Sequence, residues 1–218
     1  AQQHLRPRAF GHKAGRVAVD RVVTACAKAG VKMLSLYAFS TENWRRPPHE
    51  VKILMELIET ALREEAEKMR KNDIRLRVLG DRTALSASLR SAIDDAEALT
   101  ASGSRMDVVL AINYSGQWAL CETARHLAQA VADGTLQADA IDEAAFSAHR
   151  PMPDLPPVDL LIRSSGEMRL SNFHLWELAY AELWFTDVLW PDFGEAQLDA
   201  AFAAYHHRDR RFGALSQP

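Results

Sequence analysis

The chain has 218 residues, of which 48% are hydrophobic and 25% charged, with a formal net charge of −3 at pH 7. These values are typical of a globular protein, and we expect residues 1–218 to form a single domain with a sizeable core. The acidic balance argues against a general nucleic-acid binder, and no apolar run approaches the roughly 20 residues that cross a bilayer. Cys26 and Cys121 are isolated, which excludes a disulfide framework and a cysteine metal cluster and favours a reducing, cytoplasmic location.

Apolar runs and helical patterns alternate along the chain. This alternation predicts an α/β fold with a mostly parallel sheet and helices on both faces. A helix of about 17 residues is expected to follow Gly15 and to end at Gly30. The remaining pattern predicts strands at 31–38, 74–79, 106–113 and 158–162, helices at 50–71, 85–99, 117–132, 142–149 and 196–206, and loops at 39–48 and 151–157.

The most informative stretch follows the last predicted strand. Arg163 and Arg169 flank the residues Ser-Ser-Gly-Glu, and Ser171 comes two residues later. Ligands of open α/β sheets bind at the carboxyl ends of the strands, and guanidinium groups are well suited to phosphate oxygens. The stretch therefore predicts an oxyanion site, whereas the competing interpretation pairs both arginines with Glu167 and nearby acids.

The residues from Arg163 to Phe193 resemble the C-terminal signature of the cis-prenyltransferases, the undecaprenyl diphosphate synthase family. That signature runs Arg-Thr-(Gly/Ser)-Gly-Glu-x-Arg-(Ile/Leu)-Ser-Asn-Phe, then Leu-Trp-x-x-Ala-Tyr-x-Glu-Leu-x-Phe-Thr-x-x-x-Trp-Pro-Asp-Phe. This chain departs from it with Ser164 in place of Thr. The resemblance extends over roughly residues 6–213 and implies a cis-prenyltransferase-like fold in one domain.

The resemblance also implies a function. A member of this family condenses isopentenyl diphosphate with an allylic diphosphate primer, here expected to be farnesyl diphosphate. The product would be an undecaprenyl-type polyprenyl diphosphate, which serves as a lipid carrier in cell-wall synthesis. The implied protein is a Mg²⁺-dependent, cytoplasmic homodimer that does not bind nucleic acid and contacts the membrane peripherally to release its product.

The resemblance assigns roles to individual residues. Ser40 and Asn43 would be catalytic, in a loop resembling Phe-Ser-x-Glu-Asn-Trp-x-Arg-Pro that closes over the substrates, and Glu182 would bind Mg²⁺. The C-terminal Arg-x-Gly motif would reach the partner subunit's site in the dimer. The implied substrate-binding residues are Arg8, His12, Trp44, Arg46, Arg163, Arg169, Ser171, Arg211 and Gly213.

Several of these residues have other interpretations from the sequence alone. Trp44 fits a surface loop packed on the body of the protein equally well, and His12 fits a solvated or capping residue. The apolar stripe of helix 50–71 serves a core and a hydrophobic tunnel wall equally. After the strand at 106–113 the family carries Asn-Tyr-Gly-Gly-Arg, from which Ser115 and Gln117 depart, and Ser115 is expected to cap the next helix.

The family begins with a strand and the loop Met-Asp-Gly-Asn-Gly-Arg-Trp, whose Asp holds Mg²⁺. Ala1 matches the position just after that loop, so we expect an N-terminally truncated form that is inactive as written. Two other functions remain open from the sequence. In the first, the chain is a non-catalytic partner subunit of a heteromeric cis-prenyltransferase. In the second, it is an unrelated phosphate-binding α/β domain.

Overall fold

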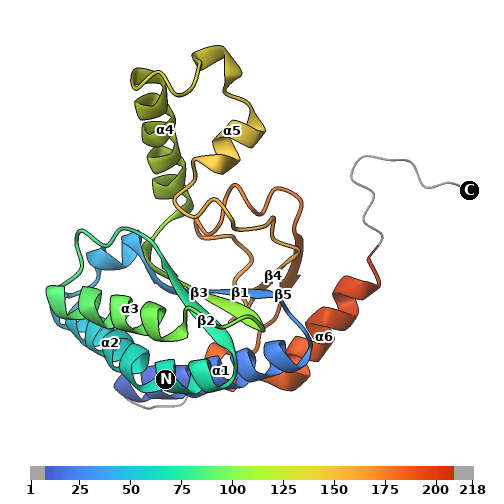
Figure 1. Cartoon of the computed structure of the whole chain (residues 1–218). Coiled ribbons are helices and arrows are strands. Elements are labelled where there is room, and N and C mark those ends of the chain that lie inside the picture. Colours follow the sequence, from blue (N-terminus) through green and yellow to red (C-terminus); the bar gives the residue numbers. More distant parts are fainter. Residues whose placement is uncertain (1–7, 209–218) are drawn as a thin grey trace, which may run out of the picture. The chain divides into compact units, whose positions relative to one another are not determined.

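The computed structural model describes residues 8–208, with side chains from residue 15 onward. The chain divides into two compact units. Within the described residues, unit 1 comprises 8–25, 156–171 and 175–208, and unit 2 comprises 26–155 and 172–174. Each unit contains its own parallel sheet (Figure 1).

Unit 2 is built on a three-stranded parallel sheet in the order β1-β3-β2. The strands are β1 (Met33–Ser40), β2 (Ile74–Leu79) and β3 (Met106–Tyr114). The central strand β3 is buried at eight of its nine positions, which explains its continuous apolar sequence. Along β2, buried apolar residues alternate with Arg75 and Arg77, so the two faces of this edge strand have different partners.

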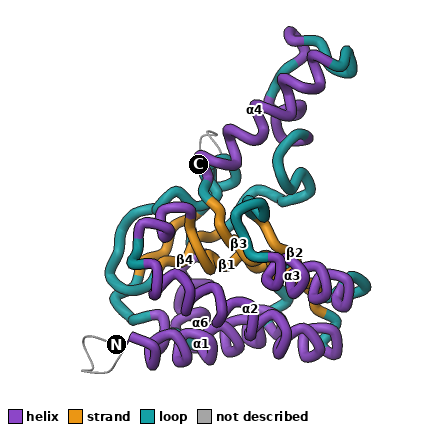
Figure 2. The backbone as a smooth tube through the Cα atoms, turned by 90° about the vertical axis from the view of Figure 1, so that its left-hand side faces the viewer, coloured by secondary structure: helices purple, strands orange, loops and turns teal. Residues whose placement is uncertain are grey.

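Two helices pack on each other and on β2. They are α2 (Pro48–Lys71) and α3 (Ala87–Thr100), which lie side by side in both views (Figures 1 and 2). Helix α2 begins at Pro48, two residues before the expected start, because proline is well suited to the first helical position. The apolar stripe of α2 contributes Val51, Leu62 and Ala66 to the buried residues.

Helix α4 (Gly116–Ala132) follows β3 directly and contacts the short helix α5 (Glu143–Ala148). Ser115 caps α4, since its hydroxyl accepts a hydrogen bond from the Trp118 amide at 3.1 Å, as the sequence predicted. The His126 ring lies 2.8 Å from the carbonyl oxygen of His149, which ties α4 to the end of α5.

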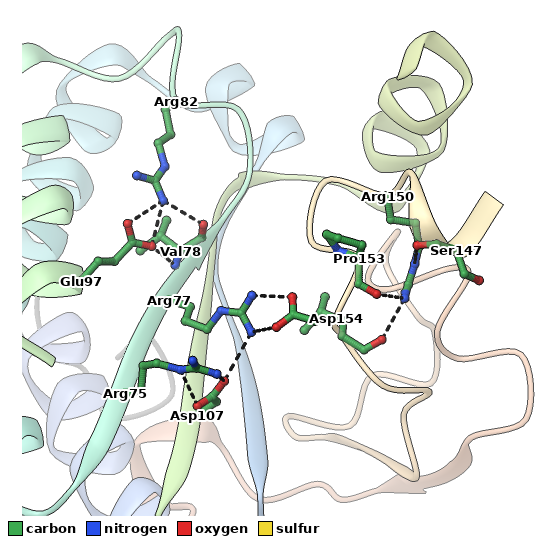
Figure 3. Close-up of polar contacts among 11 residues, drawn as sticks. Arg75, Arg77, Val78, Arg82, Glu97, Asp107, Ser147, Arg150, Pro153 and Asp154 are labelled. Carbon is green, nitrogen blue, oxygen red and sulfur yellow. Dashed lines mark hydrogen bonds and ion pairs between the residues drawn. The ribbon is translucent and has the colours of Figure 1, made fainter. Parts of the chain in front are cut away.

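Arginines fix the proline-rich connector that follows α5 (Figure 3). Arg77 donates two hydrogen bonds of 2.6 Å to the carboxylate of Asp154 and a longer one to Asp107 on β3. Arg75 binds Asp107 as well. Arg150 donates to the carbonyl oxygens of Pro153 and Leu155 at 3.0 and 2.8 Å. The polar face of β2 therefore holds the connector in place.

At the end of β2 the backbone comes very close to β3. Gly80 has φ +142°, and a Cβ atom there would lie 1.9 Å from the carbonyl oxygen of Ile112. Only glycine fits this position, because it needs both the positive φ and the space.

Unit 1 contains a pair of parallel strands, β4 (Leu160–Arg163) and β5 (Glu182–Phe185). Its helices are the first 18 residues of α1 (Arg8–Lys28) and α6 (Glu195–His206). The 3₁₀ turn η4 (Trp190–Asp192) is bound to α1, because Trp190 Nε1 donates to the Gly15 carbonyl at 3.2 Å and Arg21 donates to the Pro191 carbonyl at 2.6 Å.

Every strand pair in the described part of the chain is parallel, and the α/β class is confirmed. Several details differ from the expectation, including β1, which lies two residues later than predicted. Helix α1 begins at Arg8 rather than after Gly15, β4 lies one to two residues later, and β5 was not predicted. No helix within residues 8–208 combines the length and the apolar character needed to span a membrane.

Candidate active site

The two predicted catalytic residues lie together where β1 ends in unit 2. Ser40 is the last residue of β1, and the 3₁₀ turn η2 (Thr41–Arg45) follows it. The Asn43 side-chain oxygen accepts a hydrogen bond of 3.0 Å from the Ser40 backbone amide. The expected loop is thus partly helical, and Asn43 closes the turn that begins at Ser40.

Trp44 is held by a hydrogen bond and an aromatic contact but remains partly exposed. Its indole Nε1 donates to Asn113 Oδ1 at 2.7 Å, and its ring meets Phe39 edge-on with centroids 5.3 Å apart. The residue is nevertheless 41% exposed. Arg46 donates to Glu50 at 3.1 Å on the surface of α2, so its predicted contact with the primer remains a prediction.

A second set of contacts to the η2 turn comes from Asn172, which lies in the stretch that resembles the family signature. Asn172 Nδ2 donates to Glu42 at 2.8 Å. The Asn172 backbone oxygen and Oδ1 accept hydrogen bonds of 2.6 and 2.9 Å from the Gly116 and Gln117 amides at the start of α4. Asn172 has φ +60°, a conformation that asparagine tolerates better than most residues.

The next two residues anchor the same segment in unit 2. Phe173 stacks on Tyr37 with centroids 4.5 Å apart and an interplanar angle of 11°. His174 is 2% exposed, and its Nε2 lies 2.7 Å from the Ser35 hydroxyl. Residues 172–174 are therefore bound to unit 2 by two side-chain hydrogen-bonding groups and one aromatic stack.

The contact between Asn172 and Glu42 has an electrostatic signature. Partial burial acts to raise the pKa of Glu42, but hydrogen bonds, chiefly that from Asn172, hold this pKa below its usual value of 4.5. A depressed carboxylate pKa stabilises the fold above about pH 4.5, and the contribution is lost as the pH falls through the lower folded value.

In unit 1, three of the predicted substrate-binding residues converge at the carboxyl end of β4. Arg163 Nη1 donates to the Arg169 carbonyl at 2.6 Å and to the Ser171 hydroxyl at 2.7 Å. The intervening turn has positive φ at Ser165 and Gly166, and the Gly166 amide donates to the Thr186 carbonyl at 2.9 Å. The turn thus brings two guanidinium-bearing residues and a hydroxyl into one cluster.

The charges of this cluster favour an added anion. Burial lowers the pKa of Arg163, the neighbouring guanidinium of Arg169 lowers it further, and Glu167 acts in the opposite direction. Arg169 forms an ion pair with Glu167, as the competing interpretation expected for it. Their side chains are 63% and 42% exposed, so this pair is weak.

Glu182, the predicted metal ligand, is the first residue of β5. Its Oε2 accepts a hydrogen bond of 2.7 Å from Arg208. Among the residues that the structure describes, no group of three or more His, Cys, Asp or Glu side chains is placed to hold a metal ion. Metal binding by Glu182 therefore remains a prediction.

The other predicted site residues lie at the ends of the chain. Arg8 and His12 are on the first turns of α1, where the backbone alone is described. Arg211 and Gly213 fall outside the described residues. Asn113 and Asn172 were not predicted as site residues, although both lie in motifs that resemble those of the family.

Comparison with known proteins identifies the family. The family model described as "Putative undecaprenyl diphosphate synthase" matches residues 1–213. The ditrans,polycis-undecaprenyl-diphosphate synthase ((2E,6E)-farnesyl-diphosphate specific) of Vibrio cholerae is 50% identical over 217 residues, covering 100% of this chain and 87% of the relative. The enzyme of the same name from Escherichia coli K12 is 47% identical, covering 98% of this chain and 84% of its own length.

Two solved structures are similar. Lavandulyl diphosphate synthase from Lavandula x intermedia, in complex with dimethylallyl diphosphate, has a TM-score of 0.95 and 37% identity, covering 98% of this chain and 92% of its own. A "probable undecaprenyl diphosphate synthase" from Campylobacter jejuni has a TM-score of 0.82 and 31% identity, covering 92% of each chain. The interpretation as an unrelated phosphate-binding domain is therefore wrong. The chain belongs to the undecaprenyl diphosphate synthase family of cis-prenyltransferases, and it is a transferase.

Proposed function

We propose that this protein condenses isopentenyl diphosphate units in the cis configuration onto farnesyl diphosphate, giving an undecaprenyl-type polyprenyl diphosphate. The observation that carries the proposal is the cluster in which Arg163 reaches both Ser171 and the backbone of Arg169. The names of the relatives, which specify (2E,6E)-farnesyl diphosphate, support the choice of primer.

The reaction breaks the allylic carbon–oxygen bond of the primer, and the diphosphate leaves with the electron pair. The double bond of isopentenyl diphosphate supplies the electrons of the new carbon–carbon bond, and a proton is then lost. Arg163, Arg169 and Ser171 would hold the diphosphate of isopentenyl diphosphate with charge-assisted hydrogen bonds. Ser40 and Asn43 would lie beside the reacting groups, and Trp44 would help to exclude water.

Arg8, His12 and Arg46 would face the diphosphate of the primer. Glu182 would hold Mg²⁺, an ion that usually takes one or two carboxylates together with substrate phosphates. When bound, the ion neutralises charge on the departing diphosphate. In this structure Arg208 donates to one oxygen of the Glu182 carboxylate, Oε2.

The test of this proposal is the binding of isopentenyl diphosphate to the full-length protein. Arg163→Ala and Arg169→Ala should each weaken binding roughly ten- to a hundredfold, since a charge-assisted hydrogen bond contributes about 1.5–3 kcal/mol. Arg125→Ala is the matched control, because Arg125 pairs with Glu122 on the exposed surface of α4. Unchanged affinity of both variants in a calorimetric titration would remove these arginines from the site.

Other parts of the proposal concern the assembly, activity and location of the protein. We propose a homodimer in which Arg211 and Gly213 reach the partner's site. The inactivity of the 218-residue chain, a cytoplasmic location and peripheral membrane contact at product release stay predictions. A radiolabel incorporation assay with the 218-residue chain tests the first of these.

A further inference from the structure

The indole of Trp44 has a single fixed point in its plane. Its Nε1 donates to Asn113 Oδ1 over 2.7 Å, and the residue as a whole is 41% exposed. The ring also makes an edge-on contact with Phe39, itself 1% exposed, and this contact is apolar and less directional than the hydrogen bond. The orientation of Trp44 therefore depends on where the Asn113 oxygen points.

The orientation of the Asn113 amide is fixed by its other contact. Asn113 Nδ2 donates to the Asp81 carbonyl at 2.8 Å, and the Asp81 amide donates back to the Asn113 carbonyl at 3.1 Å. A flipped amide would present its NH₂ group to the indole N–H and its oxygen to the Asp81 carbonyl, two repulsive pairings. The amide thus has one favourable orientation, with its oxygen toward Trp44.

The surroundings of Asn113 are rigid. The residue is 4% exposed and lies near the end of the buried strand β3 with φ +50°, a left-handed conformation that asparagine adopts more readily than most residues. Gly80 lies against the adjacent backbone and leaves no room for a side chain. The hydrogen-bond acceptor for Trp44 is therefore in place before any ligand arrives.

We propose that Asn113 is a positioning residue that sets the orientation of Trp44, and through it the η2 turn that carries Asn43. This inference rests on the proposed function, in which the turn lies beside the reacting groups. Because a positioned group acts without reorganisation, loss of the hydrogen bond should slow the reaction of bound substrates as well as weaken binding. Asn113 itself needs no contact with substrate.

The experiment is a double-mutant cycle in the full-length protein. Asn113→Gly removes the amide and tolerates φ +50°, so it does not add backbone strain. Trp44→Phe keeps an aromatic ring against Phe39 and removes the indole N–H. Asn113→Gly should lower kcat/KM roughly three- to tenfold in the wild-type background, the effect of one neutral hydrogen bond, and should have almost no further effect with Trp44→Phe.

A second readout does not depend on turnover. The protein has five tryptophans, and Trp44→Phe identifies the Trp44 indole resonance in a ¹⁵N–¹H spectrum. Asn113→Gly should shift that resonance alone. The control is Thr83→Val, which removes a hydroxyl that donates to the Asp81 carboxylate at 2.6 Å in the same turn and should leave both readouts unchanged.

Three results would overturn the inference. The first is an Asn113→Gly effect on kcat/KM that is equally large in both backgrounds. The second is an unshifted Trp44 indole resonance in Asn113→Gly. The third is a Thr83→Val variant as impaired as Asn113→Gly, since this would show that any disturbance of the turn suffices. A failure of the proposed function has a different signature, namely a wild-type protein that forms no polyprenyl product while the Trp44 resonance still shifts in Asn113→Gly.

Discussion

Cys26 and Cys121 occupy opposite environments. Cys26 is 2% exposed, and burial raises the pKa of its thiol to about 11, whereas Cys121 is exposed on α4. Because the thiolate is the reactive form, we predict that an aromatic disulfide reagent at pH 8 modifies one thiol per folded chain rapidly. Cys121→Ser should abolish this fast phase, and denaturant should release the second thiol. Two fast thiols in the native protein would contradict the burial of Cys26.

Individual site residues were predictable to the extent that their chemistry is local. Arg163, Arg169 and Ser171 lie within nine residues, and their side-chain types alone indicate an anion site. Asn113 and Asn172 were not predictable in this way, because their partners Trp44 and Glu42 lie 69 and 130 residues away in the sequence. A buried amide that orients a side chain far away in the sequence produces no periodic pattern in the amino-acid sequence.

Among the structural elements, the junction of β2 and β3 has the strictest backbone requirement. We predict that Gly80→Ala lowers the free energy of unfolding by roughly 2–4 kcal/mol, since the new Cβ would collide with the Ile112 carbonyl oxygen at a φ that alanine disfavours. Gly30→Ala is the control, because φ there is +80° but no atom lies within 4 Å of the added Cβ. Gly30→Ala should lower the free energy of unfolding by only about 1 kcal/mol, through backbone strain. Equal losses in urea unfolding would show that the close approach is not the cause.

The connector after α5 depends on a salt bridge. Asp154→Asn should lower the free energy of unfolding by about 1 kcal/mol, a modest loss because the Asp154 side chain is 57% exposed although that of Arg77 is only 18% exposed. The substitution should also increase proteolytic cleavage near residues 151–157. The hydrogen bond with Arg77 holds the pKa of Asp154 below its usual 3.8, so the stabilisation exists above that pH and disappears as the pH falls further.

The salt-bridge prediction is checked by measuring thermal unfolding of Asp154→Asn and wild type at pH 7 and in strong acid. The difference should vanish in strong acid. Asp133→Asn serves as control and should be nearly neutral, because it removes a charge but keeps an oxygen that can accept from Gln129. A difference that persists unchanged in acid would exclude the ion pair as its origin.

The main elements were readable from sequence because most are long and strongly patterned. The apolar runs of β1, β2 and β3 and the amphipathic α2 were predicted within a few residues. Strand β5 was missed because its four residues have no separating turn signal of their own and, within residues 8–208, pair with β4, some 20 residues away. The start of α1 was placed too late because Gly11 and Gly15 suggested a loop, although helices tolerate single glycines at a modest cost.

At the scale of the whole molecule, the proposed homodimer makes a specific prediction. If the C-terminal tail completes the partner's site, mixing Arg211→Ala with Arg163→Ala chains should restore a share of the activity. Each heterodimer would contain one site with both lesions and one with neither. Activity is measured after subunit exchange has been demonstrated. A mixture as inactive as each variant alone would mean that the sites are not shared.

The contacts of residues 172–174 determine which continuous segment of the gene encodes a complete unit 2. Unit 2 is encoded in two pieces, a long one and a three-codon one, with 16 codons of unit 1 between them. A fragment spanning residues 26–155 would lack the aromatic ring stacked on Tyr37 and the imidazole beside Ser35. Any continuous segment that carries the whole of unit 2 therefore also carries the 16 residues 156–171 of unit 1, and a fragment that ends at residue 155 lacks the tripeptide.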